Sequence, residues 1–321
     1  MRATIALFLL LAWQAAARFC TLYDHERVST VPPLVVPPRG APRPLGPHTN
    51  VTFERIPFLP GLVNGDKTSA VIVYPTEAAL DSDDTFPFLS FAHATFVGGS
   101  FPPTDIAYKT LLTQVVSLGF IVVAPESCTS KECASNFAKD QLTTITDCKS
   151  NRTLHPALAA ADFTRVGVFG HSMGAMATLA SAGGSAHGYN PASYSIVAAA
   201  SMHPCWDPLE VPRQVSVPIL LTAGDKDVIC PDGCARTFFG DVAQTGQKVL
   251  FDVAGSDHFD PTDLGYCKED RAVALFLACW VRGEHCDLVY GPGGHAICSQ
   301  VTNGTLANCT VAGRGPASRG S

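Results

Sequence analysis

The stretch from Arg165 to Ala180, RVGVFGHSMGAMATLA, decides the fold. Its first half is a short apolar run, which favours a buried strand. Small, helix-forming residues follow from Met173, and glycines stand two positions before and two positions after Ser172. A strand that turns sharply into a helix needs small residues at those positions, because larger side chains would collide with the neighbouring strand and helix. The stretch therefore predicts a strand–turn–helix unit with Ser172 at the turn.

The composition is that of a globular protein with a large core. The 321 residues are 46% hydrophobic and 16% charged, and the formal net charge is −6. Disordered and nucleic-acid-binding chains are richer in charge, and the latter are commonly basic. We therefore expect no nucleic-acid partner.

The start of the chain, residues 1–17, has the pattern of a secretory signal peptide. Arg2 precedes an apolar run from Ile5 to Trp13, and Ala15 to Ala17 offer a cleavage site. The run is too short to span a bilayer, and no later segment approaches about 20 uninterrupted apolar residues, so no transmembrane segment is expected. The alternative to a cleaved signal is an uncleaved anchor.

Cysteines and glycosylation sequons agree with export. All twelve cysteines follow residue 17, an even number that is compatible with six disulfides. The spacings Cys128–Cys133 and Cys230–Cys234 lack the partners of a metal site, so we expect disulfides and no metal. Four N-x-S/T sequons add to the prediction of a secreted glycoprotein: Asn50, Asn151, Asn303 and Asn308.

The central region alternates between apolar strands and helices. Strands are expected at 70–74, 88–92, 120–124, 166–169, 196–200, 219–222 and 249–253, and helices at 106–118, from 173 onward and at 268–281. Continuous apolar strands separated by helices are typical of a doubly wound, mostly parallel sheet covered on both faces. The fold class is therefore α/β.

Composition divides the rest of the chain. A proline-rich segment at 18–50 is expected to be extended, and the α/β domain to occupy 51–285. Residues 286–321 are rich in glycine and cysteine, which indicates a tail held by disulfides rather than a second domain. No dinucleotide or phosphate-binding glycine pattern occurs, so no cofactor is implied.

A serine nucleophile at Ser172 needs a base and an acid. In a fold of this kind these follow in the order acid, then histidine, each after a later strand. His258 is the histidine that lies just beyond a late strand, whereas His203 follows an earlier strand and is the second choice. Asp225 and Asp227 both follow the strand at 219–222. We favour Asp227, because Asp225 also suits a turn-forming role.

Acyl transfer also needs two backbone N–H groups to stabilise the oxyanion. One is expected from Met173, the residue after the nucleophile, and the other from the loop Ala94-Thr95-Phe96, through Thr95 or a neighbour. His171 precedes Ser172, and we expect its side chain to point away from the nucleophile and to have a structural role.

Together these residues resemble the α/β-hydrolase superfamily. Within it, the chain is similar to the secreted cutinase-like polyesterases, which include polyethylene terephthalate (PET) hydrolases, and to platelet-activating-factor acetylhydrolases and chlorophyllases. The similar segments keep one order between about residues 70 and 283: FPFLSFAHATFVGG, LGFIVVAPE, RVGVFGHSMGAMATLASA, VAAASMHPCW, VPILLTAGDKDVICP, GSDHFDP and the last helix.

The resemblance implies nucleophile Ser172, acid Asp227 and base His258. It also implies that Trp206 and the Thr95–Phe96 pair flank the scissile ester. The oxyanion loop of this group usually carries His-Gly or Pro-Gly, whereas this chain has alanine at position 94. Alanine at this position is compatible with a loop that has no positive φ there.

The spacing between Ser172 and Asp227 favours an open cleft. The 55 positions that separate them must hold a helix, two strands and their connections, so no large cap domain is expected. The resemblance and this cleft imply a secreted serine carboxylic-ester hydrolase that acts through an acyl-enzyme on bulky, lipid or polymeric esters. Alternatives are a chlorophyllase-type ester hydrolase, a serine peptidase of the same fold, or a non-catalytic secreted binding protein.

Overall fold

The structure is a computed structural model that describes residues 44–57, 59–60, 62, 69–79, 84–95, 97–98, 103–127, 136–183, 190–204, 215, 217–242, 247–290, 297–298 and 306–312. The expected signal peptide at 1–17 and most of the proline-rich segment at 18–50 lie outside the described residues.

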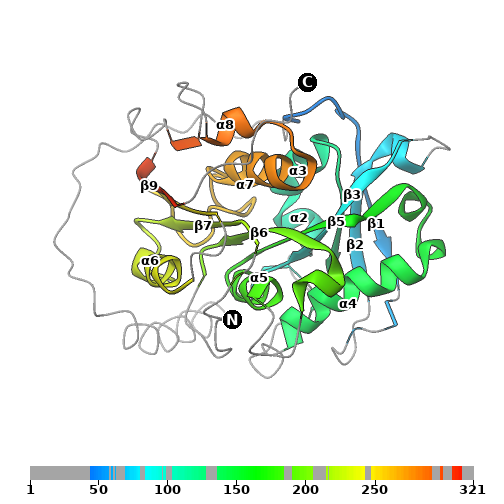
Figure 1. The fold of residues 1–321 in the computed structure, drawn as a ribbon, viewed down its shortest axis with the longest axis horizontal. Coiled ribbons are helices and arrows are strands. Elements are labelled where there is room, and N and C mark those ends of the chain that lie inside the picture. Colours follow the sequence, from blue (N-terminus) through cyan, green and yellow to red (C-terminus); the bar gives the residue numbers. More distant parts are fainter. Residues whose placement is uncertain are drawn as a thin grey trace.

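Within the described residues, a nine-stranded sheet has the order β1-β2-β4-β3-β5-β6-β7-β8-β9, and it runs through the molecule (Figure 1). The central neighbours, from β4 to β8, pair in parallel, whereas β1, β2 and β9 pair antiparallel with their neighbours at the two edges. The predicted α/β fold with a mostly parallel sheet is therefore confirmed. The strands are β1 (Val51–Ile56), β2 (Ala70–Pro75), β3 (Phe86–Ala92), β4 (Ile121–Pro125), β5 (Ala161–His171), β6 (Ile196–Met202), β7 (Ile219–Gly224), β8 (Lys248–Val253) and β9 (Leu306–Ala312).

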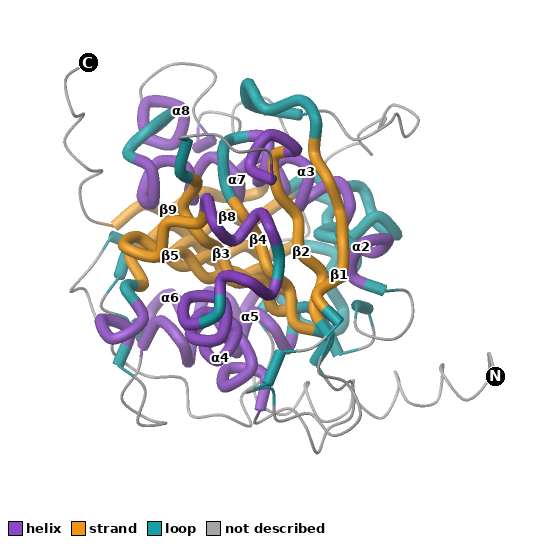
Figure 2. Tube along the Cα trace, turned by 90° about the vertical axis from the view of Figure 1, so that its right-hand side faces the viewer, coloured by secondary structure: helices purple, strands orange, loops and turns teal. Residues whose placement is uncertain are grey.

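Helices cover both faces of the sheet. Figure 2 shows α4, α5 and α6 on one side of the strands and α3, α7 and α8 on the other. The α-helices are α2 (Thr104–Ala107), α3 (Lys109–Ser117), α4 (Phe137–Ser150), α5 (Met173–Gly183), α6 (Asp232–Asp241), α7 (Asp270–Leu277) and α8 (Cys286–Tyr290). Short 3₁₀ turns are η1 (Thr76–Ala79), η3 (Arg152–Leu154), η4 (Pro156–Ala160) and η5 (Pro191–Tyr194), and η6 (Ala278–Arg282) is a π-helical turn.

The core consists of two apolar layers, one on each face of the sheet. Val71 and Val73 of β2 lie in one layer, and Ile72 and Tyr74 lie in the other. Successive side chains of a strand point to opposite faces, so a strand that is covered on both sides must be apolar at every position. This explains why the central strands are continuous apolar runs in the sequence.

Two of the expected helices are each divided into two elements in the structure. The helix expected at 106–118 is two helices, α2 and α3, which meet at Tyr108, and α3 ends before Gly119, whose φ is +85°. The helix expected at 268–281 is α7 continued by η6, and it ends at Gly283 with a φ of +79°. Glycine adopts these left-handed conformations without steric cost.

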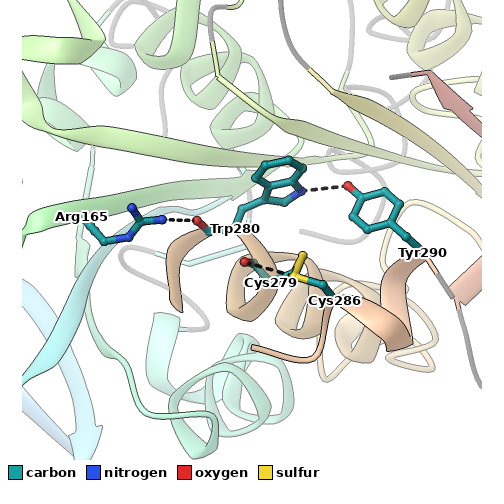
Figure 3. Close-up of a disulfide and its surroundings, with 5 residues drawn as sticks. All are labelled: Arg165, Cys279, Trp280, Cys286 and Tyr290. Carbon is teal, nitrogen blue, oxygen red and sulfur yellow. Dashed lines mark hydrogen bonds between the residues drawn. A yellow bond between two sulfur atoms is a disulfide. The ribbon is translucent and has the colours of Figure 1, made fainter. Parts of the chain in front are cut away.

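The tail after residue 285 is joined to the α/β domain. A disulfide joins Cys279 of η6 to Cys286 at the start of α8, and Trp280 donates a hydrogen bond to the hydroxyl of Tyr290 (Figure 3). Arg165 of β5 donates to the carbonyl of Trp280, which fixes this unit to the sheet. Further on, β9 pairs with β8 and completes the sheet.

The even cysteine count is compatible with six disulfides, but Cys148 and Cys267 are free thiols, so six do not form. Another disulfide joins Cys298 to Cys309, and Cys230 and Cys234 are also disulfide-bonded. Cys148 is a residue of α4 and is fully buried in the apolar layer between this helix and the sheet, where a thiol packs as a small hydrophobic group. Burial raises the pKa of the Cys148 thiol, which keeps it protonated.

Candidate active site

The turn at Ser172 is as tight as the glycine spacing predicted. β5 ends at His171 and α5 begins at Met173, and Ser172 between them has a φ of +58°. A Cβ atom at Gly174 would lie 1.9 Å from the carbonyl oxygen of Ala92, and one at Gly170 would lie 2.3 Å from that of Gly174. Only glycine fits at either position, and a non-glycine residue with positive φ between them indicates a strained functional site.

Ser172, His258 and Asp227 form one hydrogen-bonded chain. The Nε2 atom of His258 lies 2.9 Å from Oγ of Ser172, and its Nδ1 atom lies 2.8 Å from Oδ2 of Asp227. The three residues are 8%, 6% and 5% exposed, in the order serine, histidine and acid. They follow β5, β8 and β7, whose carboxyl ends lie at one edge of the sheet.

Asp227 is held as a carboxylate from both sides. Its Oδ1 atom accepts hydrogen bonds from the backbone N–H groups of Ile229 and Cys230. Burial by itself raises the pKa of Asp227, but the charge of His258 and the hydrogen bonds from His203 and His258 lower it below its usual value. Asp225, the other acid considered, accepts a hydrogen bond from the N–H of Gly255.

His203 lies behind Asp227 and makes no hydrogen bond to Ser172 in the described structure. Its Nδ1 atom is 2.6 Å from Oδ2 of Asp227, and its Nε2 atom is 2.5 Å from Oε1 of Glu269. Sequence reasoning weighed His203 as a base and did not identify Glu269. An acidic residue at the start of a helix is an ordinary feature, since it complements the helix dipole.

His171 connects the loop after β3 to the loop of His258. Its Nε2–H donates to the backbone carbonyl of His258, so its Nδ1 atom accepts from the hydroxyl of Tyr108. That hydroxyl accepts in turn from the N–H of Ala94. Burial lowers the pKa of His171, which keeps the ring neutral, as this arrangement requires.

The expected oxyanion donors lie at the same edge of the sheet. Met173 is the first residue of α5, and the N–H groups of a first helical turn have no acceptor within their own helix. The N–H of Ala94 bonds to Tyr108, which leaves Thr95, a half-buried residue, or a later residue as the second donor. Neither Ala94 nor Thr95 has a positive φ, so alanine is compatible with this loop. Phe96 and Trp206 lie outside the described residues.

The cluster His203–Asp227–His258 also has the residue types of a metal site. Its nearest nitrogen and oxygen atoms lie within 4.8 Å of one another. Both imidazole Nδ1 atoms face the same carboxylate oxygen at 2.6 and 2.8 Å, which are the distances of N–H···O hydrogen bonds. Two N–H···O hydrogen bonds to Asp227 therefore account for the close approach of these three side chains.

Apolar side chains surround this edge of the sheet. Ile106, Val228, Leu264 and Tyr266 are among the few large hydrophobic side chains that are exposed in the described residues. Val228 is next to Asp227, and Thr110 of α3 bonds to Asp263, which brings the α2–α3 region beside the loop that carries Leu264. None of the helices in the described residues is long and apolar enough to cross a membrane.

Comparison with known proteins identifies the family of this chain. The model of the PET hydrolase-like family matches residues 90–284, more than half of the chain. This chain belongs to the PET hydrolase-like family. The matched region contains Ser172, Asp227 and His258, and the family membership confirms the resemblance to cutinase-like α/β-hydrolases.

Two cutinases are similar to this member of the PET hydrolase-like family. Cutinase 1 of Thermobifida cellulosilytica is 25% identical over 190 residues, which cover 59% of this chain and 67% of the cutinase. The cutinase of Thermobifida fusca (strain YX) is 25% identical over 190 residues, which cover 59% of this chain and 58% of that protein. The match thus leaves about a third or more of each relative uncovered, and both relatives indicate an ester hydrolase.

Proposed function

We propose that the protein is a secreted serine carboxylic-ester hydrolase. The observation that carries the proposal is the hydrogen-bonded chain Ser172–His258–Asp227 at a strained strand-to-helix turn. A serine hydroxyl is a weak nucleophile until a base accepts its proton, and the base needs an acid that fixes its tautomer. The Nδ1–H of His258 points at Asp227, so its Nε2 atom is the one available to accept the proton of Ser172.

The reaction runs in two steps. Ser172 Oγ bonds to the ester carbonyl carbon while its proton passes to His258, and the tetrahedral oxyanion accepts hydrogen bonds from the N–H groups of Met173 and of Thr95 or a neighbour. The C–O bond to the alcohol then breaks, and His258 returns the proton to the leaving oxygen. Water, deprotonated by His258, attacks the acyl-enzyme and releases the acid and the free serine.

Bulky, lipid or polymeric esters are the proposed substrates. The exposed apolar residues Ile106, Val228 and Leu264 make the surroundings of the site compatible with nonpolar chains. β6 ends at Met202 and β7 begins at Ile219, a connection too short for a large cap domain. Phe96 and Trp206 are proposed to flank the scissile ester. A chlorophyllase-type specificity is the alternative within this class.

Export is supported by the cysteine chemistry and by the sequons. The disulfides Cys279–Cys286 and Cys298–Cys309 are bonds that persist in oxidising compartments. Asn50 and Asn151 are exposed, as glycan acceptors must be. We propose that residues 1–17 are the signal that directs this export.

Hydrolysis of p-nitrophenyl butyrate and labelling by a fluorophosphonate test the function. We expect turnover by the wild type, a covalent label on Ser172, and loss of both in Ser172→Ala with an unchanged thermal transition. Ser201→Ala is a matched control, because Ser201 is a buried serine at the same edge of the sheet, and in the described part of the chain its hydroxyl donates to the backbone carbonyl of Ala175. No turnover and no labelling would favour a binding protein. A series of esters that includes a polyester film and chlorophyll then distinguishes the substrate classes.

A further inference from the structure

A second buried acid–histidine pair stands behind the acid of the proposed triad. His203 follows β6 and has a φ of +50°, a strained backbone for a histidine. Its side chain and those of Asp227 and Glu269 are 0% exposed. Ser172, His258, Asp227, His203 and Glu269 therefore form one continuous chain of hydrogen bonds, and its last three side chains are inaccessible to water.

The partners of His203 determine its charge. Both ring nitrogens face carboxylate oxygens, which accept hydrogen bonds and do not donate them, so both nitrogens carry a proton. Glu269 also accepts hydrogen bonds from the hydroxyls of Thr222 and Ser256. Burial opposes a charge on His203, but the charge of Glu269 and the hydrogen bonds to both acids raise the pKa of His203 to about 10.

These charges act on His258 through Asp227. A cation at His203 alone would cancel much of the negative charge of Asp227, which is the charge that stabilises His258 when it takes the proton of Ser172. Glu269 on the far side balances that cation. Asp227, His203 and Glu269 together then carry a net charge of −1 while His258 is neutral. Protonation of His258 brings the total charge of the four groups to zero.

We propose that His203 and Glu269 are positioning residues of the active site: His203 holds Asp227 in place as a cation, and Glu269 offsets its charge so that Asp227 presents a full carboxylate to His258. The proposal rests on the ester-hydrolase function proposed above. Neither residue touches the substrate or Ser172, and both act through Asp227.

Other titratable groups near this pair remain the same in the test. His171 faces His203 and His258 from β5, Asp252 acts on His203 from β8, and Asp260 and Asp270 act on Glu269 from the adjacent loop and from α7. Lys268 pairs with Asp260 at 3.4 Å. These groups are present in every variant, so a comparison of variants at His203 and Glu269 changes only the side chains of this pair.

The experiment compares His203→Gln with the double variant His203→Gln/Glu269→Gln, with Ser201→Ala as control. In His203→Gln, two buried carboxylates face each other without a cation, so one of them takes up a proton near neutral pH. We expect kcat near pH 7 to fall about 100-fold with little change in KM, and the acidic limb of the pH profile to move up by about one unit. The double variant also lacks the Glu269 carboxylate. The acidic limb of its pH profile should return to the wild-type position, and its kcat should be at least about tenfold higher than that of His203→Gln.

A purely structural role of His203 and Glu269 would reverse the order of kcat in the single and double variants. If His203 and Glu269 only fill space, the double variant, with two buried side chains replaced, is at least as impaired as the single variant, and the acidic limb stays in place. That result, or wild-type kcat in His203→Gln, overturns the proposal. In both cases the fluorophosphonate label on the wild-type Ser172 shows that the proposed function itself still holds.

A measurement on the wild type covers the case of a variant that does not fold. In protein labelled with ¹⁵N-histidine, we expect one imidazole ring with both nitrogens protonated at about pH 8, where an ordinary histidine is neutral. A spectrum in which every ring is neutral at that pH overturns the assignment of the charge. This readout does not depend on ester turnover.

Discussion

Gly174→Ala is the substitution for which the structure makes the sharpest prediction. Gly174 is the second residue of α5, two positions after Ser172. In an ordinary helix this change is favourable by about 1 kcal/mol, because alanine has the higher helix propensity. Here the new Cβ atom would lie 1.9 Å from the carbonyl oxygen of Ala92 and 2.7 Å from that of His93.

The magnitude follows from these distances. Ordinary van der Waals contact begins at 3.4 Å, so the end of β3 and the start of α5 must separate by about 1.5 Å. Overpacking of this kind costs about 1 to 3 kcal/mol, which outweighs the gain in propensity. The Ala92 carbonyl leads into the loop of Thr95, and a displacement of about 1 Å in an active site can cost about 100-fold in rate.

Ester hydrolysis and thermal denaturation measure the two effects. We expect Gly174→Ala to lower kcat/KM about 100-fold and the melting temperature by about 2 to 8 °C, because a net loss of about 1 to 2 kcal/mol lowers it by about 2 to 4 °C per kcal/mol in a domain of this size. Gly240→Ala is the matched control, because Gly240 is an exposed residue of α6 where a new Cβ atom would have no other atom within 4 Å. That control should be neutral or slightly stabilising. Wild-type activity and melting temperature in Gly174→Ala would refute the steric argument.

Three further predictions follow from the same structure. Asp227→Asn should lower kcat by several orders of magnitude, because it stabilises the wrong tautomer of the histidine, whereas Asp225→Asn should retain activity; steady-state kinetics with the reverse order would contradict the assignment of the acid. Burial raises the pKa of Asp252 to about 6, above its ordinary value of 3.8. The folded state therefore binds this proton more tightly than the unfolded chain, and folding stability falls as the pH rises from about 4 to about 6. Asp252→Asn lacks this group, so thermal scans across that window should show its stability rising relative to the wild type by about 2 kcal/mol. Finally, iodoacetamide should modify Cys148 only after unfolding, as detected by peptide mass mapping, and modification in the folded protein would contradict the burial of Cys148. The same mapping should not find Cys267 in a disulfide.

Much of the fold was predictable because its determinants are local. The central strands are apolar at every position, since both faces of each strand are covered. The turn at Ser172 was predictable because the close approach of backbone at Gly170 and Gly174 excludes any side chain. By contrast, β1 and β9 are edge strands with one partner each, and β9 has no apolar run that marks it as a strand. The pairing of cysteines also escaped prediction, because it depends on distances in space.

For the site, the sequence by itself determined the order of Ser172, Asp227 and His258 along the chain and their places after successive strands. Their catalytic roles stay a prediction. Only the tertiary structure shows that Asp227, and not Asp225, bonds to His258, and only it placed His203 between Asp227 and Glu269. These contacts join residues 24 and 66 positions apart. A strand pattern records which face is buried, whereas the charge and hydrogen bonds of a buried group are set by neighbours that folding alone brings together.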